Sequence, residues 1–440
     1  MRKMKIASML LLLAGVSVIA ACSSGGNGVA ESGNASSGAA ATGTGSGGAT
    51  KTVKMLNFKV EIKDQLAAMI KEYEQLTPGV KIALETIGGG ADSAAALRTK
   101  FSSGDQPDIF LNGGYKELDL WLEHLEDLSD QPWAEHVLPF AKEPMTKDGK
   151  LYGQPLNLEG YGFIYNKDLF KQAGITELPK TFDELEAAAA KLQAAGITPF
   201  VNGYGEWWVL GNHLANIGFA YQDNPDTFIA GLDQGTATFV DNEKFQQWVK
   251  LFDLTLKYGG KNSLQVDYNT QISEFATGKA AMTQQGNWTQ VSLSETNPSL
   301  NIGLLPMPIN NDAEAMDKLP VGVPYSWVVY NKSKVKDEAK AFLDWMVSSD
   351  IGKRYMTEEF KHIPAFDNIT ANNEILGQLA ADIIAYSQAN RTISWNWFKF
   401  PGGEATSHYF SDAMQGYVGG QLSKEAMLKE FLTKWNDLNK

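Results

Sequence analysis

Cysteine is almost absent from this chain: Cys22 is the only one in 440 residues, which excludes an intrachain disulfide. The five histidines are scattered, with no H-E-x-x-H pair, and no stretch has the spacing of an EF-hand loop. The G-x-S-x-G elbow and the P-loop are missing as well. These absences disfavour a metalloenzyme, a serine hydrolase and a nucleotide-binding protein, and we expect neither a metal nor a cofactor.

Positive charge is in deficit: the chain has 38 Lys and Arg residues against 51 Asp and Glu residues, which gives a formal net charge of -13. This balance disfavours nucleic acid or an anionic membrane surface as a direct partner. The 43% hydrophobic and 20% charged residues are typical of a globular protein, and 440 residues exceed one ordinary core, so we expect two lobes. Tryptophan is abundant: eleven residues, all beyond position 120, can present flat apolar faces to a ligand.

The N-terminal segment has the pattern of an export signal. Arg2, Lys3 and Lys5 are positive, and residues 7–20 form an apolar run too short to span a bilayer as a mature helix. Residues 19–22, Ile-Ala-Ala-Cys, resemble a lipobox, in which the cysteine is diacylated and becomes the new N-terminus. We therefore expect residues 1–21 to be a lipoprotein signal peptide and Cys22 to be a lipid anchor. The alternative is an ordinary secretory signal with an incidental cysteine.

The residues that follow Cys22 are small and polar. Residues 23–50 consist of Gly, Ser, Ala, Thr, Asn and Val with the single charge of Glu31, so they cannot build a core. We interpret residues 22–50 as the lipidated cysteine and a flexible tether.

The chain after the tether begins with a β-α-β pattern. Residues 53–58 and 80–86 read as strands, and residues 63–76 place apolar side chains at helical spacing. Such a unit predicts a parallel sheet and hence an α/β protein. A glycine run at 88–90 precedes a helix expected to begin near Asp92, and residues 121–128 predict an amphipathic helix in which Trp121 belongs to the core.

The most informative stretch is residues 272–288. An apolar helical face ends at Gly278, which can take a positive φ; a short strand follows at 279–284; Gly286 and Asn287 then supply turn and N-cap signals. Trp288 is thus carried off the carboxyl end of a strand, where open α/β sheets form ligand crevices. The alternative is a tryptophan packed under a loop.

This stretch, a helix, then Phe-x-x-Gly-Lys-Ala-Ala-Met and Gly-x-Trp, resembles the signature region of family 1 extracellular solute-binding proteins. These are the sugar-capturing subunits of ABC importers, and the maltose-binding protein is a familiar relative. Residues 103–110, 153–169, 321–330 and 362–365 also resemble the family's pattern. The resemblance implies a two-lobed periplasmic-binding-protein-like α/β fold of type II, each lobe a sheet flanked by helices, joined by crossing strands. Residues 51–162 and 320–365 would form lobe 1, and residues 163–319 and 366–440 lobe 2.

The function implied by the resemblance is capture of a carbohydrate, in our interpretation an oligosaccharide, in the cleft between the lobes. Closure about the hinge would follow binding, and the membrane subunits of an ABC permease would receive the sugar. Together with the tether, the resemblance implies a monomer anchored through Cys22 on the extracellular face of the cytoplasmic membrane, as in Gram-positive bacteria.

Two residues carry the predicted site. Glu159 falls where the maltose-binding relative has a cleft carboxylate, and an ionised carboxylate offers several acceptor positions to sugar hydroxyls. Trp288 is the expected stacking platform. We favour Trp207 over Trp208 for the cleft. The remaining candidates for ligand binding are Trp395, Trp397, Glu61, Asn112, Tyr115 and Glu206.

Two alternatives stay open at this point. Glu159 could be a solvated charge at a strand edge. The protein could also be a secreted, cell-surface glycan-active enzyme with paired carboxylates, for example Glu159 with Glu206. We favour binding over catalysis because the catalytic motifs are missing from the sequence.

Overall fold

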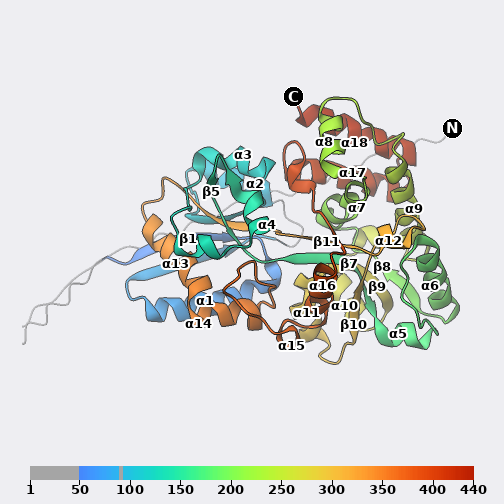
Figure 1. The fold of residues 1–440 in the computed structure, drawn as a ribbon, viewed down its shortest axis with the longest axis horizontal. Coiled ribbons are helices and arrows are strands. Elements are labelled where there is room, and N and C mark those ends of the chain that lie inside the picture. The colour runs from blue at the N-terminus through green and yellow to red at the C-terminus, as the bar shows by residue number, and fades with distance from the viewer. Residues whose placement is uncertain (1–48, 89–92) are drawn as a thin grey trace, which may run out of the picture. The chain divides into compact units, whose positions relative to one another are not determined.

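The computed structural model describes residues 49–88 and 93–440 (Figure 1). The predicted signal peptide, Cys22 and nearly all of the tether lie outside the described residues, as do Gly89, Gly90 and Asp92. Two β-sheets, each with its own hydrophobic core and flanking helices, divide residues 49–440 into a first and a second lobe. None of the helices in the described ranges has both the length and the apolar composition that a membrane span needs.

The first lobe is built on a five-stranded sheet in the order β2-β1-β3-β12-β6. The first three strands along the chain pair in parallel, and β12 runs antiparallel to β3 and to β6. A separate two-stranded ribbon joins β4 and β5. The strands are β1 (Lys51–Asn57), β2 (Val80–Thr86), β3 (Ile109–Asn112), β4 (Thr146–Lys147), β5 (Lys150–Leu151), β6 (Gln154–Pro155) and β12 (Ser326–Val329).

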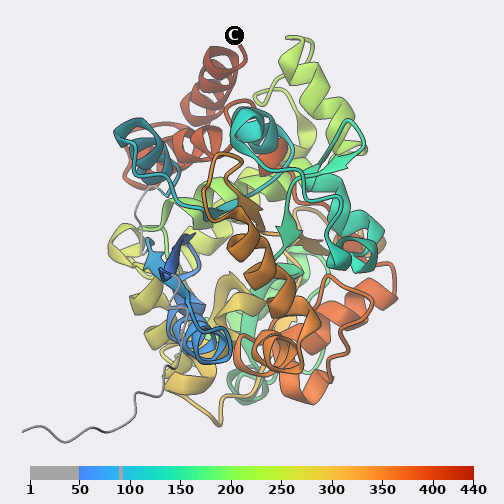
Figure 2. The same ribbon diagram turned by 90° about the vertical axis from the view of Figure 1, so that its left-hand side faces the viewer.

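Helix α1 (Lys63–Leu76) confirms the predicted β-α-β start, and its periodic apolar face is buried as far as Tyr73. Leu76 departs from the expectation, with 58% of its surface exposed, because it ends the helix beyond the edge of the core. Tyr73 packs on Phe342 of α13 with ring centroids 4.9 Å apart, so α1 and α13 lie side by side (Figures 1 and 2). The other helices of this lobe are α2 (Ser93–Ser103), α3 (Lys116–Trp121), α4 (Pro139–Lys142), α13 (Lys336–Ser348) and α14 (Asp350–Arg354).

The second lobe has a mixed six-stranded sheet in the order β13-β11-β7-β9-β8, with β10 also paired to β7. Its central strand β7 is buried at every position and runs antiparallel to β9, β10 and β11. The strands are β7 (Glu159–Asn166), β8 (Thr198–Val201), β9 (Ala280–Gly286), β10 (Ile302–Leu305), β11 (Leu319–Gly322) and β13 (Thr392–Ile393).

Helices surround this second sheet, and the last two of the chain pack against each other (Figure 1). Helix α6 begins with the predicted capping box, in which Thr181 and Glu184 satisfy each other's backbone N–H groups. The helices are α5 (Lys167–Gln172), α6 (Phe182–Ala194), α7 (Ala215–Ala220), α8 (Pro225–Asp233), α9 (Glu243–Lys257), α10 (Tyr268–Ala276), α11 (Gln290–Thr296), α12 (Ala313–Met316), α15 (Asn373–Leu376), α16 (Gln378–Gln388), α17 (Glu404–Val418) and α18 (Lys424–Leu438).

The chain passes between the sheets just before β7, between β11 and β12, and again after β12. The first core draws on residues 53–156 and 323–369, and the second on residues 161–319 and 376–435 together with Ile363. The lobe boundary expected after Gly162 divides β7, whereas all of β7 pairs within the second sheet.

Two predicted helices differ in the structure. The helix expected over residues 121–128 does not form: α3 ends at Trp121, and Leu125 instead makes a β-bridge with Tyr330. Trp121 is only partly buried and packs against the first core, 4.8 Å from the Phe101 ring. The helix expected over residues 375–388 is split into α15 and α16, because Gly377 takes a φ of +97° that a helix cannot accommodate.

The stretch around Trp288 folds largely as predicted. Helix α10 ends at Ala276, Gly278 has a φ of +75°, and β9 follows. The side chain of Asn287 is not an N-cap, since its Oδ1 accepts the Gly160 N–H of β7 at 2.9 Å. Trp288 therefore sits in a short 3-10 turn between β9 and α11, tied to the central strand of the second sheet.

Candidate ligand-binding site

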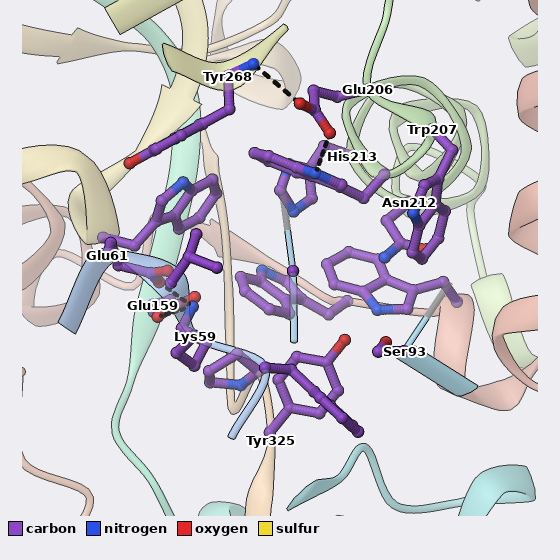
Figure 3. Close-up of a pocket in the computed structure, with 18 of the residues that line it drawn as sticks. Lys59, Glu61, Ser93, Glu159, Glu206, Trp207, Asn212, His213, Tyr268 and Tyr325 are labelled. Carbon is purple, nitrogen blue, oxygen red and sulfur yellow. Dashed lines mark hydrogen bonds and ion pairs between the residues drawn. The ribbon is translucent and has the colours of Figure 1, made fainter. Parts of the chain in front are cut away.

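A cavity of about 840 Å³, counted with its open mouth, is lined by residues from both lobes (Figure 3). Five of the eleven tryptophans line it. They are Trp207, Trp208, Trp288, Trp395 and Trp397. Phe58, Tyr268, Tyr325 and Phe398 add further aromatic surface. Nearly half of the tryptophans in the sequence thus lie around one cavity.

Seven of the nine predicted ligand-binding residues line this cavity: Glu61, Glu159, Glu206, Trp207, Trp288, Trp395 and Trp397. Asn112 and Tyr115 do not. The Asn112 side chain is fully buried, and its Oδ1 accepts the Gly114 N–H at 2.8 Å, which shapes the turn after β3. Tyr115 turns its ring towards Lys399, whose Nζ lies 5.1 Å from the ring centroid.

A cluster of three charged side chains, Lys59, Glu61 and Glu159, joins the lobes at one wall of the cavity. Lys59, in the loop after β1, places Nζ 2.7 Å from Oε1 of Glu61 and 2.9 Å from Oε1 of Glu159. Burial alone would lower the pKa of Lys59, but the charges of Glu159 and Glu61 outweigh it and raise the pKa, so the ammonium stays charged. Only 2% of Glu159 is exposed, which rules out a solvated strand-edge charge. Burial raises the pKa of Glu159, and Lys59 opposes that rise.

Trp288 lines the cavity but is largely covered. Its exposed fraction is 8%, its Nε1 donates to Oε1 of Gln285 at 2.8 Å, and it packs in the second core. The Lys59 ammonium lies 5.7 Å from the Trp288 ring centroid, and the His213 ring lies 4.8 Å away. Trp288 is therefore both a core residue and part of the cavity wall.

Sequence reasoning missed several polar residues of the wall, Asn212 and His213 among them. Both lie in the π-helix Val209–Leu214, a form that is often found at functional sites. This turn packs so closely on α17 that a Cβ at Gly211 would meet the Ser407 carbonyl oxygen at 1.9 Å, so glycine is required there. Burial, with a smaller contribution from Lys59, lowers the pKa of His213 to about 3, so the imidazole is neutral. No local pattern in the sequence signals a π-helix.

Trp207 and Trp208 both line the cavity, whereas the sequence favoured Trp207 alone. The ring of Trp207 stacks on His408 with centroids 3.7 Å apart. The indole N–H of Trp208 donates to Oε2 of Glu206 at 3.1 Å, and the backbone N–H of Tyr268 donates to Oε1 of the same carboxylate at 2.9 Å (Figure 3).

Several buried polar atoms beside the cavity have no hydrogen-bond partner within the described part of the chain. On residues of the lining they include Oδ1 of Asn212, Nδ1 of His213, and Nε1 of Trp395 and of Trp397. Buried polar atoms are normally paired, because an unpaired one costs about 1–3 kcal/mol. Each of these atoms is covered by the protein and lies within the wall, beside indole rings whose centroids, for Trp395 and Trp397, are 4.4 Å apart.

Comparison with known proteins places the chain in a family. The family model of the bacterial extracellular solute-binding proteins matches residues 59–353, well over half of the chain, so the protein belongs to that family. It is 24% identical over 313 residues to the multiple sugar-binding protein of Streptococcus mutans serotype c, covering 69% of this chain and 73% of that protein. It is 26% identical over 346 residues to the melibiose/raffinose/stachyose-binding protein MelE of Bacillus subtilis, covering 67% and 77%.

Solved structures confirm the two-lobed type II fold. The solute-binding protein RafE in complex with raffinose is 23% identical, with a TM-score of 0.76 over 89% of this chain and 100% of that one. A chitin oligosaccharide binding protein, also 23% identical, gives a TM-score of 0.78 over the same shares. A Bacillus licheniformis sugar transporter with stachyose, 20% identical, gives 0.73 over 88% and 100%. The family and the fold class expected from the sequence are both confirmed.

Proposed function

We propose that this protein is the extracellular substrate-binding subunit of an ABC importer and that it captures an oligosaccharide in the cavity described above. The observation that carries the proposal is the lining of the cavity, which sets five indole side chains beside the carboxyl groups of Glu61, Glu159 and Glu206. A sugar ring has an apolar face that stacks on an indole and a rim of hydroxyls that both donate and accept hydrogen bonds.

The relatives support this ligand class. One relative is named for binding multiple sugars and another for binding melibiose, raffinose and stachyose, and structural neighbours were solved with raffinose and with stachyose. Glu61 and Glu159 supply carboxylate oxygens at the wall, and in our proposal they accept sugar hydroxyls. The indole faces, Trp288 among them, provide the stacking surface.

Closure of the two lobes about the ligand is the second part of the proposal. The cavity wall contains Lys59 and Glu61 from the first lobe and Trp208 and Trp288 from the second, so a bound sugar contacts both. A ligand stabilises the conformation in which it makes more contacts, which favours the closed form. A further link already spans the lobes, because the Tyr325 hydroxyl donates to Oε1 of Glu404. The permease would then recognise the closed protein and take up the sugar.

The location belongs to the same proposal. A diacylated Cys22 followed by the tether would hold a monomer at the outer face of the cytoplasmic membrane, beside the permease.

Binding without catalysis is supported by how the two candidate carboxyls are used. Glu159 accepts from Lys59 and, at 3.3 Å, from Nδ2 of Asn157. Glu206 accepts from two N–H groups of the protein itself. A glycosidase needs one carboxyl free to donate a proton and a second free to attack or to activate water, and in Glu206 both oxygens are already bonded within the protein.

The test is a binding screen of the chain from residue 22 onward with Cys22→Ser, against raffinose, stachyose, maltotriose and chitin oligosaccharides. We expect one sugar family to raise the melting temperature in a saturable way, since it binds only the folded state, and to change tryptophan fluorescence. The sugar should be recovered intact. Appearance of cleaved products would favour the enzyme, and the absence of any shift would exclude these sugars as ligands.

A further inference from the structure

Glu206 is a buried carboxylate placed between two segments of the cavity wall. Only 3% of it is exposed. Its Oε1 accepts the backbone N–H of Tyr268, the first residue of α10, at 2.9 Å, and its Oε2 accepts the indole N–H of Trp208 at 3.1 Å (Figure 3). The carboxyl group thus bonds both the amino end of a nine-residue helix and one indole of the wall.

The two groups that Glu206 holds are both parts of the cavity wall. The Trp208 ring meets Tyr268, His213 and Trp288 at angles of 51°, 77° and 71°, so within the described residues no aromatic ring stacks parallel on it. An indole fixed by its nitrogen cannot rotate in its slot without losing that bond. Trp207 differs, because the His408 ring covers it at 3.7 Å and 20°.

We infer that Glu206 is a positioning residue: it sets the orientation of Trp208, which is the tryptophan of this pair that stacks on the ligand. This inference rests on the proposed sugar-binding function, and it assigns Glu206 a different role from the ligand-binding residue expected from the sequence. Glu206 acts through Trp208. Its other carboxyl oxygen accepts the Tyr268 N–H and so holds the start of α10 against the same wall.

A double-mutant cycle separates a positioning role from direct contact with the ligand. In Glu206→Gln the amide can offer its one oxygen to only one of the two N–H groups and turns its NH2 towards the other. We expect sugar affinity to fall about tenfold, the loss that goes with one charge-assisted hydrogen bond. The Trp208→Phe variant lacks the indole N–H. In that background the amide introduced by Glu206→Gln can turn its oxygen to the remaining donor, the Tyr268 N–H. Adding Glu206→Gln to Trp208→Phe should therefore cost less than about threefold.

The chain offers a matched control. Nε1 of Trp435 donates to Oδ1 of Asp233 at 2.9 Å, the same kind of indole–carboxylate bond, between α8 and α18 and outside the cavity lining. Asp233→Asn should leave sugar affinity unchanged. Equal losses from Glu206→Gln in both backgrounds would overturn the inference and make Glu206 a ligand contact. No loss in either background would also overturn it.

A readout without ligand keeps this inference distinct from the proposed function. With fluorotryptophan incorporated throughout, the ¹⁹F resonance that disappears in Trp208→Phe is that of Trp208. We expect Glu206→Gln to shift or broaden this resonance and to leave that of Trp435 in place, whether or not any sugar binds. An unchanged Trp208 resonance contradicts the positioning role, whereas failure of every sugar to bind the unmodified protein contradicts the proposed function.

Discussion

The ammonium of Lys59 lies 2.9 Å from the Glu159 carboxylate, and this ion pair joins the loop after the first strand of one lobe to the first residue of the central strand of the other. Glu61 lies 2.7 Å from the same ammonium, so one cation serves two buried carboxylates. The group forms part of the cavity wall and lies over Trp288. Lys59 thus compensates two buried carboxylates, links the two lobes and lines the cavity.

Replacing Lys59 with Met should destabilise the protein by about 3–5 kcal/mol, because removal of one partner leaves buried charge without compensation. Urea unfolding at neutral pH measures the change. The double variant Lys59→Met with Glu159→Gln should recover part of the loss, since the second substitution removes one of the stranded charges. A loss below about 1 kcal/mol for Lys59→Met would mean that the group behaves as an exposed ion pair.

Trp288→Ala should weaken sugar binding by about 1–3 kcal/mol, the range for aromatic packing and buried apolar area. It should also lower the free energy of unfolding by about 3–5 kcal/mol, because Trp288 is 8% exposed and packs in the second core. The sequence alone predicted a stacking platform at Trp288, with a tryptophan packed under a loop as the alternative. Calorimetric titration and urea unfolding of the same variant measure the two losses.

The control is a tryptophan of the same core outside the cavity lining. Trp248 is fully buried, and its indole N–H donates to the Leu214 carbonyl at 2.7 Å. Trp248→Phe should lower stability and leave sugar affinity unchanged, whereas Trp288→Phe should lower affinity with a small change in stability. Unchanged affinity in Trp288→Phe would make Trp288 a core residue alone.

The buried carboxyl group of Glu117 should make the free energy of unfolding depend on pH. It is buried on α3, and burial, followed by the charge of nearby Glu404, raises the pKa of its carboxyl above the ordinary 4.5. The folded state therefore keeps a proton that the unfolded state releases, so this group's contribution to stability falls as pH rises from the unfolded pKa to the folded one. The slope is about 1.4 kcal/mol per pH unit. Glu117→Gln should remove this slope.

Unfolding free energies compared between about pH 6.5 and pH 8 isolate the effect. Below that range His213 and His362, each with its pKa lowered to about 3 chiefly by burial, act in the opposite direction, because their unfolded forms take up protons. The exposed Glu177→Gln provides the control and should keep the slope of the unmodified protein. A Glu117→Gln variant that retains the full slope contradicts the assignment.

The sequence predicts best where one local pattern decides the structure. The apolar spacing of α1 and the Gly278 stop after α10 needed no distant partner, and both elements form as expected. The helix expected after Trp121 fails for the opposite reason. Leu125 pairs with Tyr330, more than 200 residues along the chain, and no local pattern records such a partner.

The same distinction explains the site. Strand ends and a family resemblance point to Glu159 and Trp288 in the sequence, and both residues line the cavity. Asn112 also lies at the end of a strand, but its amide oxygen is used within the turn that follows. Lys59 and His213 went unrecognised because their importance comes from burial beside residues far away in sequence.

The anchor is tested apart from the folded lobes. If Cys22 is diacylated, cells fed an alkyne-bearing fatty acid should label the unmodified protein, which should sediment with membranes because two acyl chains hold it firmly. Cys22→Ser should abolish the label and release the protein into the medium, while sugar binding by the released chain stays unchanged, since the residues that line the described cavity begin at Phe58. Under the alternative of an ordinary secretory signal, the unmodified protein would itself appear unlabelled in the medium, and Cys22→Ser would change nothing.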